Sequence, residues 1–152
     1  MTGKCFCGAV SFELTGDPLM NALCHCRACS IAVGTTTPIH LYAMTHGNYK
    51  INGEDKIKIY NQGGTLKIGR CTECSCPIYQ GPEKSPFKAF FPRYFDGYVD
   101  GKNNTLPANL KPAFHVNYEN RGMDYNDDLP KFAVFPGGDA VMMNSDGTLV
   151  AK

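Results

Sequence analysis

The chain has 152 residues and a formal net charge of +1, from 15 lysines and arginines against 14 aspartates and glutamates. Because this charge is nearly balanced and no basic run occurs, the composition excludes a phosphate-binding surface and hence a nucleic-acid partner. No apolar stretch approaches the roughly 20 residues of a membrane span, and the start MTGKCFCGAV carries no signal-peptide pattern, so we expect a cytoplasmic protein with a single domain over residues 1–152.

The apolar residues follow a period of two more often than 3.6, and 16 glycines and 10 prolines interrupt them. This pattern predicts a mainly β fold with little helix. Strands are predicted at residues 9–14, 35–42, 56–60, 65–68, 77–79, 88–91, 113–116 and 132–135, with a hairpin turn at 61–64. Short helices are predicted at residues 27–33, ended by Gly34, and at 118–123, and a long polar loop at 96–112.

Eight cysteines fall in three tight clusters, and their spacing indicates metal binding. The patterns C-x-C, C-H-C-x-x-C and C-x-x-C-x-C place thiols near enough to share one ion, and this spacing is more typical of tetrahedral zinc than of copper(I) or iron–sulfur sites. A disulfide framework is the alternative. It would have to pair cysteines from different clusters, since those within a cluster lie too close together for relaxed bridges.

A C-x-C pair cannot fill four coordination positions, so it must borrow ligands from elsewhere in the chain. Cys5 and Cys7 joined by Cys71 and Cys74 would make a closed site of four thiolates. Such a site has no open position for a substrate. We interpret it as a structural zinc that joins the amino-terminal strand to the middle of the chain.

The remaining trio is Cys24, Cys26 and Cys29, one ligand short of a tetrahedron, which is the pattern of a catalytic zinc. Water, a substrate thiol or Cys76 could take the fourth position. If Cys76 closes the site, both zinc ions are structural; if it does not, two zinc ions per chain have different roles.

An open zinc held by three thiolates is a weak Lewis acid, and this favours ligation of a soft substrate thiol over hydrolysis. A bound thiolate beside a small carbonyl is arranged for addition or for the reverse cleavage. Arg27, Arg93 and Arg121 are available as partners for anionic substrate groups, although each is more typical of a solvated surface charge. His25, between two ligands, is expected to point away from the metal, either exposed or hydrogen-bonded behind the ligands.

The segments K-C-F-C-G-A-V-S-F-E (4–13), C-H-C-R-A-C (24–29) and C-T-E-C-S-C (71–76) occur in this order. Together they resemble the glutathione-dependent formaldehyde-activating enzyme family, also called the centromere protein V family, over roughly residues 3–80. The segment 115–132 resembles the family's closing part, in which a histidine falls on His115. One departure is Ser75, where the family commonly has a glycine that eases a positive φ.

The resemblance implies the Mss4-like fold, small β-sheets stapled by zinc. It also implies structural ligands at Cys5, Cys7, Cys71 and Cys74 and catalytic ligands at the trio. We therefore expect a zinc-dependent carbon–sulfur lyase-type enzyme that adds or removes a small aldehyde at a thiol such as glutathione, by S-hydroxymethylglutathione chemistry.

The alternative is a non-enzymatic, zinc-stabilised binding module, because proteins that share a fold need not share chemistry. A zinc deaminase is excluded, since no P-C-x-x-C segment occurs in the chain. The substrate thiol, the oligomeric state and the roles of His115 and the 96–112 loop stay open at this level.

Overall fold

The computed structural model describes residues 1–61, 64–82, 84–98 and 106–151, and it is mainly β, as predicted. The chain divides into two compact units that interleave along the sequence. Unit 1 comprises residues 1–20 and 41–111, and unit 2 comprises residues 21–40 and 112–152. The single domain over 1–152 stays a prediction.

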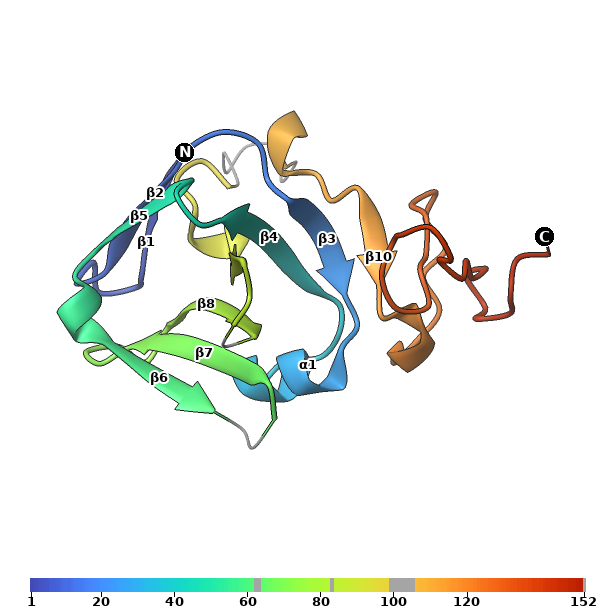
Figure 1. Cartoon of the computed structure of the whole chain (residues 1–152), viewed down its shortest axis with the longest axis horizontal. Coiled ribbons are helices and arrows are strands. Elements are labelled where there is room, and N and C mark those ends of the chain that lie inside the picture. Colours follow the sequence, from blue (N-terminus) through green and yellow to red (C-terminus); the bar gives the residue numbers. More distant parts are fainter. Residues whose placement is uncertain (62–63, 83, 99–105, 152) are drawn as a thin grey trace. The chain divides into compact units, whose positions relative to one another are not determined.

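Unit 1 is built from antiparallel strands (Figure 1). A three-stranded sheet has the order β1 (Thr2–Lys4), β2 (Ser11–Leu14) and β5 (Tyr49–Asn52). A second set of neighbouring strands has the order β4 (Ile39–Thr45), β9 (Phe87–Phe90), β8 (Pro77–Pro82), β7 (Leu66–Cys71) and β6 (Ile57–Asn61). Short 3-10 turns lie at Glu54–Lys56, Pro92–Tyr94 and Ala108–Leu110.

The core of unit 1 follows from the alternation in β2. Phe12 and Leu14 are buried there while Glu13 is exposed, because successive side chains of a strand face opposite sides. The ring of Phe12 packs 5.0 Å from that of Phe90 on β9 and 5.6 Å from that of Phe95. These aromatic contacts join β2, which follows the first cysteine cluster, to β9, which pairs with the strand that follows the third cluster.

Unit 2 has a parallel strand pair, β3 (Met20–Cys24) and β10 (Phe114–Val116). The helix α1 (Arg27–Val33) follows β3 and ends as predicted at Gly34. This glycine adopts a left-handed φ of 69°, and its N–H donates to the carbonyls of Ile31 and Ser30. A 3-10 turn, Tyr118–Asn120, replaces the predicted helix at 118–123.

Several predicted boundaries differ from the structure. The strand predicted at 35–42 lies later, at Ile39–Thr45, because it begins only after Pro38. The strand predicted at 132–135 is wrong: Phe132 makes an isolated bridge to Met142 and no strand continues from it. Residues 62–63 of the predicted turn and 99–105 of the predicted loop lie outside the described residues. Among the helices that are described, none has the length and apolar character needed to cross a membrane.

Candidate metal centres

Four cysteine sulfurs of unit 1 form a tight group. The Sγ atoms of Cys5, Cys7, Cys71 and Cys74 all lie within 4.8 Å of one another. The Cys5–Cys7 and Cys7–Cys71 sulfur separations are 3.5 and 3.8 Å. Four sulfurs placed at the usual zinc–sulfur length around a tetrahedron are about 3.8 Å apart, so the group fits a zinc ion.

The same distances argue against the disulfide alternative. A disulfide holds its sulfurs at about 2.05 Å, and all eight cysteines, each of them in a described range, are free thiols. The four-thiolate group that the spacing predicted is therefore brought together across 64 residues, from Cys7 to Cys71.

The first pair is held by a tight turn between β1 and β2. The N–H of Gly8 donates to the carbonyl of Cys5 at 3.0 Å, and the N–H of Cys5 donates to the carbonyl of Val10 at 2.9 Å. The N–H of Val10 also points to the Cys5 sulfur at 3.4 Å. Gly8 has a φ of 79°, which only glycine adopts without cost, so the glycine permits the turn that presents both thiols.

The second pair lies in a turn after β7 that has one more residue between its thiols. The N–H of Ser75 donates to the carbonyl of Cys71 at 2.9 Å, and the N–H of Cys71 donates to the carbonyl of Cys76 at 3.0 Å. Ser75 occupies the position that Gly8 has in the first turn, and its φ is 60°. The sequence departure at Ser75 therefore places a side chain in the left-handed region, as expected.

The pKa values of these thiols diverge because the groups compete for protons. The N–H of Ala9 acts to lower the pKa of Cys7, but burial and neighbouring thiols raise it to about 12. Burial opposes ionisation of Cys74, but the N–H groups of Cys76 and Cys7 help lower its pKa to about 6. Four thiolates so close together need a cation to offset their repulsion, so metal binding and ionisation are linked.

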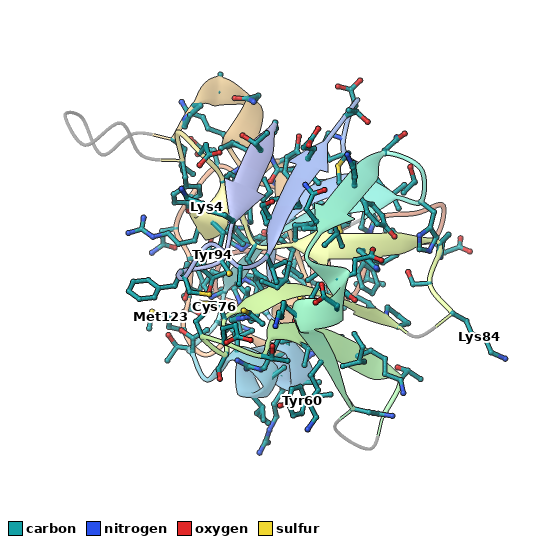
Figure 2. The ribbon with its side chains drawn as sticks, turned by 90° about the vertical axis from the view of Figure 1, so that its left-hand side faces the viewer. Lys4, Tyr60, Cys76, Lys84, Tyr94 and Met123 are labelled. Atoms are coloured by element: carbon teal, nitrogen blue, oxygen red, sulfur yellow. The ribbon has the colours of Figure 1, made fainter. Side chains whose placement is uncertain are left out.

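Cys76 lies in unit 1, beside the first group. Its thiol contacts the sulfur of Cys74 and the hydroxyl of Tyr94, and Figure 2 shows Cys76 and Tyr94 next to each other. Burial, followed by the contact with Cys76, raises the pKa of Tyr94. The predicted role of Cys76 as a possible ligand of a second metal stays a prediction.

The trio of unit 2 spans the end of β3 and the start of α1. Cys24 is the last residue of β3, Cys26 immediately precedes the helix, and Cys29 lies in its first turn. Cys24 and Cys29 are buried, with exposed fractions of 3% and 7%. In the described part of the chain, the first group is the one whose ligand atoms all lie within 4.8 Å, so the trio as a metal site stays a prediction.

Hydrogen bonds nevertheless favour a thiolate within the trio. The Cys29 thiol contacts Cys24 and is the main cause that lowers the pKa of Cys24 to about 7. The N–H of Cys26 at 3.5 Å and the side-chain amide of Asn117 at 3.6 Å both point to the Cys24 sulfur. Conversely, the contact with Cys24 raises the pKa of Cys29. Ionisation of Cys24 is therefore favoured over ionisation of Cys29.

A chain of hydrogen bonds, called the relay below, runs from His25 through His115 and Asp127 to Lys131. His25 lies between the first two thiols of the trio. His25 Nε2 lies 2.8 Å from His115 Nδ1, and His115 Nε2 lies 2.9 Å from a carboxylate oxygen of Asp127. Lys131 Nζ donates to the other oxygen of that carboxylate at 2.7 Å. Both histidines have an exposed fraction of 0%, so the suggestion that His25 is exposed is wrong.

The charges of this relay follow from burial and pairing. Burial lowers the pKa of His25 to about 4 and lowers that of His115 despite the nearby Asp127. Burial acts to raise the pKa of Asp127, but Lys131 and His115 outweigh it, and the pKa lies below its usual value. At neutral pH the relay consists of an ammonium, a carboxylate and two neutral imidazoles.

Sequence reasoning missed this relay, because no local pattern links Asp127 to either histidine. The register of the parallel pair explains how it forms, because His115 on β10 lies opposite Leu23 on β3. Residues two apart on an extended chain share a face, so His25 follows Leu23 onto the face of His115, while Cys24 takes the other face. The alternation at 22–25 was the one available signal.

Comparison with known proteins supports the family resemblance. The family model described as "Glutathione-dependent formaldehyde-activating enzyme" matches residues 1–120. Among solved structures, a Rhodobacter sphaeroides protein determined by a structural genomics programme is similar, with a TM-score of 0.53 and 20% sequence identity over 70% of this chain and 98% of that chain. At this identity the likeness bears on the fold alone. The comparison with curated proteins gave no match.

Proposed function

The chain belongs to the glutathione-dependent formaldehyde-activating enzyme family, and we propose that it is a zinc-dependent carbon–sulfur lyase-type enzyme acting on a small thiol such as glutathione. The reaction adds formaldehyde to the thiol or releases it. The observation that carries the proposal beyond family membership is the division of the cysteines between two units, with a compact group of four in one and a hydrogen-bonded trio in the other.

In this proposal the four-thiol group holds a structural zinc. Its ligands come from two turns, one near the start of the chain and one after β7, and its sulfur separations match a tetrahedron. A site filled by four protein thiolates has no position for a substrate. Its contribution is to the stability of unit 1, since binding energy at such a site is folding energy.

The trio of Cys24, Cys26 and Cys29 is proposed to hold the second zinc. Bound there, the ion would supply positive charge that keeps a substrate thiol ionised near neutral pH. The residues around it have their own tasks. Asn117 donates toward the Cys24 sulfur and disperses its charge, and burial of Cys24 and Cys29 limits access of water.

The proposed reaction balances without an oxidant or reductant. The substrate sulfur forms a bond to the formaldehyde carbon, the carbonyl π bond breaks, and the proton released by the thiol ends on the oxygen. The product is an S-hydroxymethyl thioether, and the reverse reaction returns thiol and aldehyde. Holding both reactants in one place replaces a bimolecular encounter and lowers its entropic cost.

Zinc counting and activity test the proposal together. Elemental analysis of the purified protein should give two zinc ions per chain. The variants Cys24→Ser and Cys29→Ser should each lose one ion, keep the folded state and lose catalysis of the exchange between glutathione and formaldehyde, followed by ¹³C exchange spectroscopy. Cys5→Ser should instead lose folding.

Three outcomes would contradict the proposal or its choice of substrate. If Cys24→Ser unfolds the protein as severely as Cys5→Ser, both metals are structural and the chain is a zinc-stabilised binding module. The same conclusion follows if Cys76→Ser releases the second zinc, since Cys76 would then close the shell. Glutathione at millimolar concentration that leaves thermal stability and metal unchanged would remove glutathione as the substrate.

A further inference from the structure

Unit 2 contains a recess whose lining includes none of the cysteines. Its cavity volume is about 450 Å³, and six of the residues that line it have polar side chains: His25, Arg27, Ser30, Thr36, Thr37 and Asn120. Every residue of this lining belongs to unit 2. The recess lies on the side of α1 and the turn at 118–120, and no cysteine contributes to it.

One residue of the lining carries an unsatisfied hydrogen-bonding atom. His25 is completely buried, and its Nδ1 has no hydrogen-bond partner among the described residues. Because Nε2 of the same ring is hydrogen-bonded to His115, Nδ1 is the ring nitrogen that still lacks a partner. A buried polar atom left without a partner carries a desolvation penalty, so a ligand that supplies the partner recovers that free energy.

The relay determines which kind of partner this atom needs. The carboxylate of Asp127 only accepts, so His115 donates from Nε2 and its Nδ1 is an acceptor. His25 must then donate from Nε2 to His115, which leaves Nδ1 of His25 with a lone pair and no proton. The missing partner is therefore a donor, an N–H or an O–H.

Packing around the ring holds it in this orientation. The ring of Tyr118 stands edge-on to His25 at 5.0 Å, and that of Tyr125 at 5.2 Å. The hydroxyl of Tyr125 donates at 2.8 Å to the carbonyl of Thr37, which is in the lining itself. The orientation of the acceptor is therefore fixed before a ligand arrives.

The charge of the recess points to an anion next to that donor. Arg27 is the charged side chain in the lining, and within the described residues no carboxylate lines the recess. The other arginines considered for anionic substrates are engaged elsewhere: Arg121 pairs with Asp124 at 2.9 Å, and Arg93 lies over the ring of Tyr98. A guanidinium with five donors is suited to a carboxylate.

We propose that this recess binds a small carboxylate that carries an N–H or O–H donor close to the carboxyl group, with the donor on His25 Nδ1 and the carboxylate on Arg27. The inference stands on the residues of the recess and does not depend on the proposed reaction. Two sources share this chemistry, a free acylamino or hydroxy acid and the glycyl end of a peptide such as glutathione.

The test uses two probes that differ by one donor. N-acetylglycine has an amide N–H beside its carboxylate, and N-acetylsarcosine is the same molecule with that nitrogen methylated. The zinc-loaded, ¹⁵N-labelled protein is titrated with each, and the histidine ring nitrogens are followed by two-bond ¹H–¹⁵N correlation. N-acetylglycine should bind saturably and shift Nδ1 of His25, and N-acetylsarcosine should bind about tenfold more weakly.

Variants assign the two contacts. His25→Phe should abolish the preference for N-acetylglycine, and Arg27→Gln should weaken both probes equally. Lys84→Gln serves as the control, because Lys84 projects from the turn between β8 and β9 of unit 1 (Figure 2) and should change neither affinity. Because the ring shift is measured on the wild-type protein, the proposal remains testable even if His25→Phe fails to fold.

The outcomes separate this inference from the proposed function. Equal affinity for the two probes, or binding of N-acetylglycine without a shift of His25 Nδ1, overturns it, as does the absence of binding to either probe. S-methylglutathione, which cannot supply a thiolate, identifies the source: a matching His25 shift indicates the peptide, and binding of N-acetylglycine alone indicates a free acid. Loss of the formaldehyde reaction in Cys24→Ser with probe binding retained would leave both proposals standing separately.

Discussion

The two residues of the Asp127–Lys131 ion pair should differ strongly in the stability that is lost when each is replaced. Lys131 has a side-chain exposure of 4%, whereas that of Asp127 is 39%. Lys131 Nζ also donates to the carbonyls of Asp127 and Leu129, at 2.8 and 3.0 Å. Replacing Asp127 by alanine leaves a buried ammonium without its counter-charge, while replacing Lys131 by methionine leaves a carboxylate that water can still reach.

The magnitudes follow from what each change leaves unpaired. Breaking a buried ion pair from one side costs about 3–5 kcal/mol, and the two carbonyls that still accept from Lys131 place Asp127→Ala near the lower limit. His115 also loses the acceptor for its Nε2–H. We expect a loss of about 3 kcal/mol for Asp127→Ala and about 1 kcal/mol for Lys131→Met. For a chain of this length these losses correspond to falls in Tm of about 6–12 °C and 2–4 °C.

The double variant is the decisive measurement. Asp127→Ala combined with Lys131→Met removes the stranded charge, so it should be more stable than Asp127→Ala alone by about 1–2 kcal/mol. Thermal unfolding of each zinc-loaded variant, with its metal content measured, gives the comparison. If the double variant is as unstable as Asp127→Ala, or if Lys131→Met is the more harmful single change, burial of the Lys131 charge does not govern this relay.

Three further changes probe the turns, the buried histidines and the sheet. Ser75→Gly should stabilise the zinc-loaded protein by up to about 1 kcal/mol in thermal unfolding, because glycine adopts the φ of 60° without strain. Gly8→Ala, at a φ of 79°, should destabilise it by about the same amount. If both variants change the free energy of unfolding in the same direction, φ is not the cause. Burial lowers the pKa of His40 to about 4 in the folded protein, whereas its pKa in the unfolded chain is near 6.5. Between these two pH values the unfolded chain binds one more proton than the folded protein. The free energy of unfolding therefore falls as the pH falls through this window. Urea unfolding at pH 7, 6 and 5 should therefore show a shallower fall for His40→Asn than for the wild type, and parallel curves would refute this. In β7, a Cβ at Gly69 would lie 2.7 Å from Tyr79 Cζ, so Gly69→Ala should cost about 1–3 kcal/mol in thermal unfolding, and an unchanged Tm would mean that the ring moves freely.

The features that were predicted best from the sequence are those that depend on a few neighbouring residues. The helix at Arg27–Val33 was found with its bounds, because Gly34 provides the left-handed cap. The grouping of the four thiols was predicted because coordination number forces a C-x-C pair to find partners. In both cases a few neighbouring residues carry the physical requirement.

Long-range contacts explain what was missed. The strands β1, β3 and β5 are short, and pairing with distant partners defines them more than their own alternation does. The strand expected at 132–135 is a continuous apolar run but has only bridge partners in the described chain. His25 and His115 are separated by 90 positions, and no local pattern states that two such side chains will share a face.

The interleaving of the two units sets the order in which each becomes complete during synthesis. All four thiols of the first group exist once Cys74 has left the ribosome, and unit 1 lacks nothing after Lys111. Unit 2 is different, because its trio is made early whereas His115, Asn117 and Lys131 arrive only with the last stretch of the chain. The two cysteine groups of a nascent chain are therefore completed at different times. The group of four can bind metal before the segment that buries the trio has been synthesised.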